Sequence, residues 1–135
     1  MLEHDLRHLI SLHSLEDCIT VYGYADADTA ATYLRACDLL LIPSRIESIP
    51  VIFSDAVGCG IPMVATEVGD LGTLVRKYRV GEIARPESPE ALAKSIRSAL
   101  QFGRSHYEPG MAEANADFDP RNAVQTYLSC VGYPK

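Results

Sequence analysis

The chain has 135 residues, about the length of one domain, and 47% of them are hydrophobic, which is enough to build a buried core. Its formal net charge is −6, and no run of Lys and Arg forms a basic footprint. This charge balance argues against a protein that binds nucleic acid or a membrane surface. The sequence also lacks a signal-peptide pattern and an apolar run of about 20 residues, so we expect a cytoplasmic protein.

The four cysteines are Cys18, Cys37, Cys59 and Cys130. No two of them have the Cys-x-x-Cys spacing of zinc ribbons or thioredoxin motifs. Each lies in or beside an apolar run, where a free cysteine behaves as a small hydrophobic residue. We therefore expect four reduced, buried thiols.

The first elements in chain order are a helix, a strand and a second helix. Residues 2–15 place Leu2, Leu6, Leu9 and Ile10 on one apolar helical face. Residues 18–23 are rich in β-branched side chains and end in glycine, which predicts a strand. The Ala-rich residues 26–38 predict a helix with Asp26 or Asp28 as its N-cap.

The rest of the chain alternates strands with helices. The strand at residues 39–44 is continuously apolar, as in a parallel sheet, and Pro50 and Gly60 delimit the helix after it. Ser88 and Asp119 are the predicted N-caps of two well-marked helices. The remaining expected elements are strands at 62–66 and 82–85, helices at 71–78, 88–102, 111–118 and 119–132, and a loop at 105–110. This pattern predicts one domain with a Rossmann-like, doubly wound, mostly parallel α/β sheet and helices on both faces.

Two acids flank the start of the helix at residues 50–60. In such sheets, ligands bind outside the carboxyl ends of the strands, where the loop with Glu47 lies. The helix N-terminus favours a phosphate, and ionised Glu47 and Asp55 can accept hydrogen bonds from sugar hydroxyls. This combination fits a nucleotide-sugar. The alternative is that both acids are solvated surface residues.

The segment 43–75 resembles the signature of retaining glycosyltransferases of family 4, which have the GT-B architecture. The resemblance extends over about residues 15–100. The matching residues are Pro43, Ser44, Glu47, Ser48, Pro50, Ala56, Gly60, Pro62, Val64, Ala65, Gly69 and Gly81. One departure is Asp55, which stands where the family usually has a glutamate and is one methylene shorter.

The resemblance implies a role for each residue that matches the motif. Glu47 is implied as the catalytic-site acid near the donor sugar and the pyrophosphate, and Asp55 as the acceptor of ribose hydrogen bonds. The backbone N–H groups of Ile49, Val51 and Ile52 would face the diphosphate. The donor-binding set implied is Tyr22, Gly23 and Tyr24 beside the base, together with Ser48, Ile49, Pro50, Val51, Ile52 and Asp55. Family members of this architecture use no metal, so we expect no cofactor and no metal ligand.

The resemblance also implies that part of the family's architecture is missing. Members have an N-terminal acceptor-binding domain, and their donor domain opens with two further strands. The sequence therefore predicts residues 1–135 as a single partial nucleotide-sugar-binding domain without its acceptor domain. The strand at 19–23 would pair directly with the strand at 39–43, or a partner chain would fill the gap, or the chain is a piece of a longer protein.

The sequence also fits other functions and partners. A nucleotide-sugar epimerase of the same architecture and a non-catalytic binding or assembly module are alternatives to a transferase. A homo-oligomer or a complementing N-terminal part is a possible partner, and the full-length enzyme could be peripheral to a membrane. Arg45, Lys77 and Arg79 are candidate phosphate cations, with solvated surface positions as the alternative.

Overall fold

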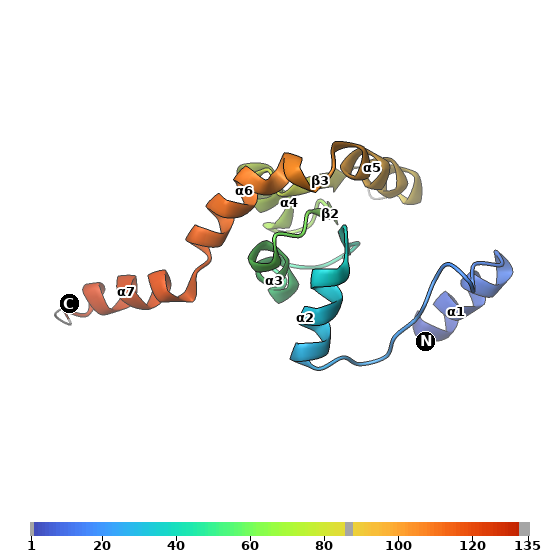
Figure 1. Ribbon diagram of the computed structural model, residues 1–135, viewed down its shortest axis with the longest axis horizontal. Helices are drawn as coiled ribbons and strands as arrows, with labels where there is room; N and C mark the ends of the chain where they lie inside the picture. Colours follow the sequence, from blue (N-terminus) through green and yellow to red (C-terminus); the bar gives the residue numbers. More distant parts are fainter. Residues whose placement is uncertain (1, 86–87, 133–135) are drawn as a thin grey trace. The chain divides into compact units, whose positions relative to one another are not determined.

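A computed structural model describes residues 2–85 and 88–132, and Figure 1 labels its elements in chain order. The chain divides into two compact units, Met1–Ala30 and Ala31–Lys135, and each is described by itself.

The first unit contains the helix α1 (Leu2–Leu12) and an irregular segment. Ile10 is buried, and an ion pair between Arg7 and Glu3, with 2.8 Å between Nη2 and Oε1, lies on the exposed face. The predicted apolar face is only partly covered, because Leu6 and Leu9 are exposed; the side chain of Leu2 lies outside the described residues.

The strand predicted at residues 18–23 is wrong. Residues 16–18 form turns, and residues 19–26 form no regular element. A strand exists only where a neighbouring strand completes its hydrogen bonds, and within the described residues β1 pairs only with β2. A β-branched composition favours extended backbone but cannot supply that neighbour.

The helix α2 (Ala27–Ala36) begins at the predicted cap. The Asp26 carboxylate accepts a hydrogen bond of 2.8 Å from the backbone N–H of Thr29. This bond stabilises the ionised form and lowers the pKa of Asp26. The side chain of Asp26 therefore replaces one of the backbone partners that a helix start lacks.

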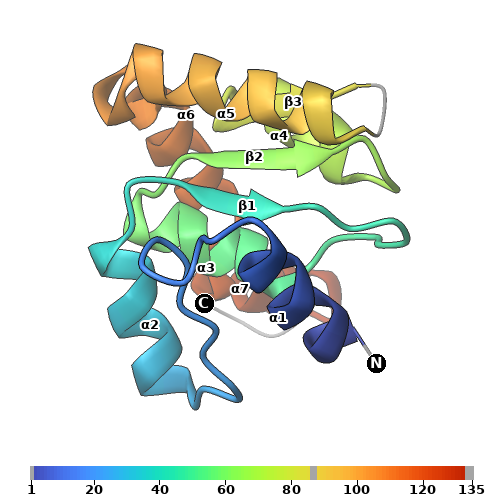
Figure 2. The same ribbon diagram turned by 90° about the vertical axis from the view of Figure 1, so that its right-hand side faces the viewer.

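The second unit is built around a parallel sheet with the strand order β1-β2-β3. Its strands are β1 (Leu40–Ile42), β2 (Met63–Thr66) and β3 (Gly81–Ala84), and Leu40 pairs with Met63 while Met63 pairs with Gly81. Figure 2 shows β1 and β2 as arrows that point the same way, with β3 on the other side of β2. All four residues of β2 are buried, so both faces of this strand are covered. The predicted α/β fold class is confirmed.

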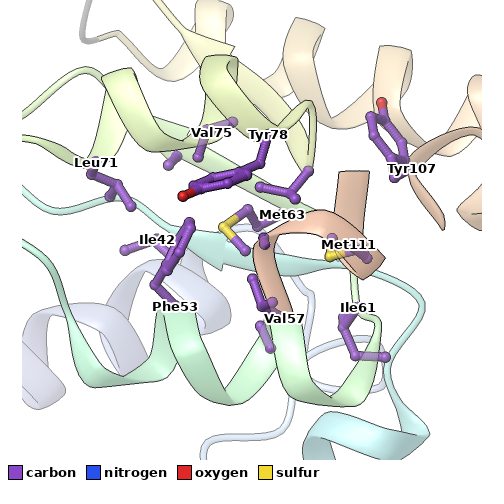
Figure 3. Close-up of a cluster of buried hydrophobic side chains, with 14 of the residues drawn as sticks. Ile42, Phe53, Val57, Ile61, Met63, Leu71, Val75, Tyr78, Tyr107 and Met111 are labelled. Carbon is purple, nitrogen blue, oxygen red and sulfur yellow. The ribbon is translucent and has the colours of Figure 1, made fainter. Parts of the chain in front are cut away.

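Two helices connect the three strands. The helix α3 (Val51–Cys59) begins after Pro50 and ends at Gly60, which is in the left-handed conformation, as the sequence predicts. The helix α4 (Leu71–Tyr78) packs against β2 and β3. Figure 3 shows Phe53, Met63 and Tyr78 pointing toward one another in the core, where a Phe118 ring lies 5.3 Å from that of Phe53.

Three further helices follow the sheet: α5 (Pro89–Phe102), α6 (Arg104–Asp117) and α7 (Pro120–Cys130). The predicted caps are confirmed, because Ser88 accepts a hydrogen bond from the N–H of Ala91 and Asp119 accepts one from that of Arg121. The helix α5 packs along β2 and β3, whereas none of the described residues of α7 is buried.

The loop predicted at residues 105–110 is wrong, because these residues belong to α6. The Pro109–Gly110 pair suggests a turn, yet both residues lie inside the helix. Tyr107, Gly110, Met111 and Ala114 are buried at helical spacing. Burial of this face, together with a 2.6 Å hydrogen bond from the Tyr78 hydroxyl to Asp117, outweighs the local preference for a turn.

The predicted burial of the cysteines is wrong for three of the four. Cys18, Cys37 and Cys130 are exposed, and Cys59 is half-buried; all four are free thiols. Each exposed cysteine lies in or next to a turn or at a helix end, where the apolar neighbours in sequence do not enclose it.

Among the described residues, no helix has the length and apolar character needed to cross a membrane.

Gly110→Ala tests the close approach of α6 to the end of α4. A Cβ atom at Gly110 would collide with the Tyr78 carbonyl oxygen, so we expect the free energy of unfolding to fall by about 1–3 kcal/mol. The matched control is Gly58→Ala, also inside a helix, whose Cβ atom would meet only Asn115 Oδ1 at 3.9 Å. This control should gain stability, by up to about 1 kcal/mol. Urea denaturation measures both changes, and equal effects of the two substitutions would contradict the close packing.

Candidate functional site at the carboxyl edge of the sheet

The candidate site lies where β1 and β2 end. Because the three strands are parallel, the loops that follow them leave the sheet at the same edge. Residues 43–50 form the first of these loops, which we call the β1–α3 loop, and it carries Glu47. Residues 67–70 form the second, the β2–α4 loop.

The carboxylate of Glu47 lies close to the backbone that enters α3. Glu47 is half-buried, and its Oε1 accepts a hydrogen bond of 3.1 Å from the N–H of Ser48. Arg45 and Ile46, just before it, are exposed, with Ile46 at 94% exposure. The loop therefore has an exposed tip and a more enclosed acid.

The N-terminus of α3 has no side-chain cap. Pro50 is the N-cap residue, and it forms no side-chain capping hydrogen bond. The first N–H groups of a helix have no intrahelical partners, and they carry about half a positive charge. The N–H groups of Val51 and Ile52 belong to this first turn, and the side chains of Ile49 and Val51 are exposed. This end of the helix is chemically suited to an anion.

Asp55 lies on the outer face of the same helix. Phe53, Ala56 and Val57 are buried, whereas Asp55 and Val51 are exposed. The two exposed residues are four positions apart, so Asp55 lies about one turn, or about 6 Å along the axis, below Val51. The carboxylate is thus available to a polar group bound beside the start of α3.

Two arginines that the sequence analysis missed lie on the same side of the sheet. Glu67 Oε1 is 2.6 Å from Arg76 Nη2, and its Oε2 is 3.0 Å from Arg85 Nε. Arg85 directly follows β3, so its position at a strand's carboxyl end was a signal that could have identified it. One carboxylate between two guanidinium groups leaves this cluster with a formal charge of +1.

The three candidate phosphate cations from the sequence, Arg45, Lys77 and Arg79, lie in different parts of the second unit. Arg45 lies in the β1–α3 loop. Lys77 Nζ is 3.3 Å from Asp117 Oδ2, and Arg79 is the C-cap of α4. Because α4 leads into the amino end of β3, Lys77 and Arg79 lie toward the opposite edge from Glu47. This placement favours the alternative that Lys77 and Arg79 are solvated surface residues, and their role as phosphate cations stays a prediction.

Tyr22, Gly23 and Tyr24 lie in the irregular segment of the first unit, whereas Glu47, residues 48–52 and Asp55 lie in the second. Tyr24 is 98% exposed and Tyr22 is 63% exposed. Their role beside a nucleotide base stays a prediction. Nowhere in the part of the chain that the structure describes do three or more His, Cys, Asp or Glu side chains gather as a metal site would need.

The family model described as "Glycosyl transferases group 1" matches residues 2–101. The chain belongs to this glycosyltransferase family. It is 30% identical over 121 residues to the amylovoran biosynthesis glycosyltransferase AmsK of Erwinia amylovora. The aligned region covers 85% of this chain and 30% of AmsK. It is 35% identical over 77 residues to a D-inositol 3-phosphate glycosyltransferase of Arthrobacter sp. (strain FB24), which covers 57% of this chain and 18% of that protein.

A solved structure extends this family assignment to the fold. Sucrose-phosphate synthase from Thermosynechococcus elongatus, a GT-B enzyme, matches with a TM-score of 0.80 and 25% sequence identity. The match covers 97% of this chain and 35% of that structure. This glycosyltransferase chain therefore has a GT-B-type α/β fold, and it spans less than a third of the two curated relatives named above.

Proposed function

We propose that this chain is the donor-binding part of a retaining glycosyltransferase of family 4. It would bind a nucleoside diphosphate sugar and act together with an acceptor-binding domain. The observation that carries the proposal is the uncapped N-terminus of α3, which lies beside Glu47 at the carboxyl edge of the sheet.

The electrostatics of this edge suit a diphosphate. The first-turn N–H groups of Val51 and Ile52 can donate to phosphate oxygens, and the helix dipole favours negative charge at the same place. Arg76 and Arg85 add positive charge on the same side of the sheet. Glu47 and Asp55 are acceptor-only when ionised, so they would take hydrogen bonds from hydroxyl groups on the sugar and the ribose.

These contacts also suggest how the chain would assist the reaction. The bond from the sugar's anomeric carbon to the diphosphate oxygen breaks, and the nucleoside diphosphate leaves with the electron pair. The α3 N-terminus and the arginines would stabilise the negative charge that develops on this leaving group. The acceptor hydroxyl would then bond to the anomeric carbon from the face that the diphosphate leaves, and its proton would pass to the leaving phosphate. Glu47 would orient the donor without forming a covalent bond.

Two other functions stay as alternatives. A nucleotide-sugar epimerase of the same architecture would release free epimerised sugar nucleotide, so product analysis separates it from a transferase. A non-catalytic module would bind the nucleotide without turnover in any longer protein that contains this chain. The family match favours the transferase over both.

The purified 135-residue chain should not transfer sugar by itself. Acceptor contacts would come from a separate domain, and without them the acceptor hydroxyl is not held near the anomeric carbon. When the chain is incubated with sugar nucleotides and a panel of sugar acceptors, we expect the rate of sugar transfer to equal the rate in buffer without the protein. Release of nucleoside diphosphate with formation of a glycoside, at a typical enzymatic rate of about 1 s⁻¹ or more, would contradict this expectation.

Donor binding tests the proposal directly. Isothermal titration of the chain with uridine, guanosine and adenosine diphosphate sugars should reveal binding of at least one of them. Glu47→Gln should weaken that binding by about tenfold to a hundredfold, the effect of losing a charged hydrogen-bond partner. The matched control is Glu113→Gln on the exposed surface of α6, which should leave affinity unchanged. Equal losses in both variants, or no binding by the parent chain, would overturn the proposal.

Asp55 should contribute less than Glu47 to the same binding. It lies about one turn into α3 and is a methylene shorter than the acid usual in the family, so a water would bridge it to the ribose. We expect Asp55→Asn to weaken donor binding by less than tenfold and Asp55→Glu to preserve or improve it. The decisive comparison is each donor with its 2′-deoxyribose analogue, since only the former offers both hydroxyl groups. A larger loss for Asp55→Asn than for Glu47→Gln would reverse the order of the two acids.

The free edge of β1 suggests what the chain would associate with in the whole protein. The strand β1 pairs on one side only among the described residues, and Leu41 is 43% exposed. Unpaired edges of this kind recruit further strands. We propose that either a complementing polypeptide or a second copy covers this edge in a cytoplasmic enzyme.

A further inference from the structure

The end of β2 and the β2–α4 loop touch the β1–α3 loop at two points, one at Ser44 and one at Glu47 itself. The first contact is made by Thr66, the last residue of β2. Its Oγ1 lies 2.5 Å from the carbonyl oxygen of Ser44 and 3.4 Å from that of Ile42. A hydroxyl has one proton to donate, so the shorter contact is the hydrogen bond.

This hydrogen bond holds the backbone just beyond the end of β1, where the strand-to-strand hydrogen bonds of the sheet have ended. The ladder between β1 and β2 ends with the pair Ile42 and Ala65, and the next residue, Pro43, has no N–H to continue it. The hydroxyl of Thr66 therefore holds the chain two residues beyond the last paired position. Thr66 is only 8% exposed and is the one buried polar residue among those that the structure describes, so water competes weakly for the bond.

The second contact is made by Gly69. A tight turn, with a 3.0 Å hydrogen bond from the Val68 N–H to the Thr66 carbonyl, brings the chain back toward Glu47. A Cβ atom at Gly69 would collide with the Glu47 carbonyl oxygen and lie 3.0 Å from Ser48 Cα. Gly69 also has a φ of +49°, which a side chain disfavours. Only glycine lets the two backbones approach this closely.

The two contacts are three residues apart on both segments. Thr66 holds Ser44 and Gly69 packs on Glu47, so Arg45 and Ile46 between them form the exposed tip. We infer that Thr66 and Gly69 are positioning residues that hold the Glu47 backbone at the start of α3, an inference that rests on the proposed donor-binding role of Glu47. Neither residue needs to touch the donor for its loss to weaken donor binding.

The exposed tip provides a readout that does not depend on any ligand. Trypsin cleaves after Arg45, and cleavage of a native protein requires local opening of the backbone. Thr66→Val keeps the side-chain shape and removes the hydroxyl, so the initial rate of cleavage at Arg45, followed by mass spectrometry, should rise about two- to tenfold. Thr66→Ser keeps the hydroxyl and should restore a rate within about twofold of the parent chain.

Ser95→Ala is the matched control. Ser95 Oγ donates to the Ile83 carbonyl over 3.3 Å, which is also a hydroxyl bond to the backbone of a strand, but it lies away from the β1–α3 loop. Its loss should leave cleavage at Arg45 unchanged, and urea denaturation measures the global stability of every variant. A parent-like cleavage rate in Thr66→Val, or an equal rise in Ser95→Ala, would overturn the inference.

Donor affinity completes the test. In the same variants, titration with the bound sugar nucleotide should give a Kd that rises severalfold for Thr66→Val and returns for Thr66→Ser. Raised cleavage with unchanged affinity would overturn the positioning role while leaving donor binding by the parent chain intact. If the parent chain binds no donor, the proposed function fails; raised cleavage in Thr66→Val would still support the loop contact, and the positioning role for a donor would be overturned with the function.

Discussion

The structure depends on the central place of β2 in the parallel sheet. Each residue of Met63–Thr66 is buried, and β2 is paired on both sides. Parallel pairing forces the chain to return through a helix after every strand, and it collects the outgoing loops at one edge. The β1–α3 loop with Glu47, the β2–α4 loop and Arg85 therefore all lie at the carboxyl edge of the sheet, although they are far apart in sequence. A shift in the register of β2 would move all of them at once.

Net charge is a poor guide to the local field at this edge. The chain has a formal charge of −6, yet the carboxyl edge combines an uncapped helix N-terminus with Arg76 and Arg85. Glu67 neutralises part of that charge, and it also holds the two guanidinium groups in place through charged contacts of 2.6 and 3.0 Å. An acidic chain can thus hold a local cluster of formal charge +1, because fields from fixed groups act over about a Debye length of 10 Å or less.

The sequence predicted best those features that depend on neighbours along the chain. Helix caps at Ser88 and Asp119 and the stop at Gly60 are local, and each lies where it was expected. The strand at 18–23 failed because a strand needs a neighbour that composition cannot provide. The loop predicted around Pro109 failed because burial of one face of α6 outweighs the preference of proline for a turn. In the site, Glu47 and Asp55 were visible through a motif, whereas Arg85 and Thr66 act through contacts between segments distant in sequence.

The proline that follows β1 separates two kinds of stability within one domain. Pro43 follows the last pair of the ladder, and beyond it the Thr66 hydroxyl and the close approach of Gly69 contact the segment around Glu47, while the sheet behind it has its own core. Opening that segment breaks none of the strand pairing, so its fluctuations draw on a small local free energy and not on the free energy of global unfolding. A ligand arriving at the edge thus meets a part of the chain that can adjust its shape, supported by a layer that does not.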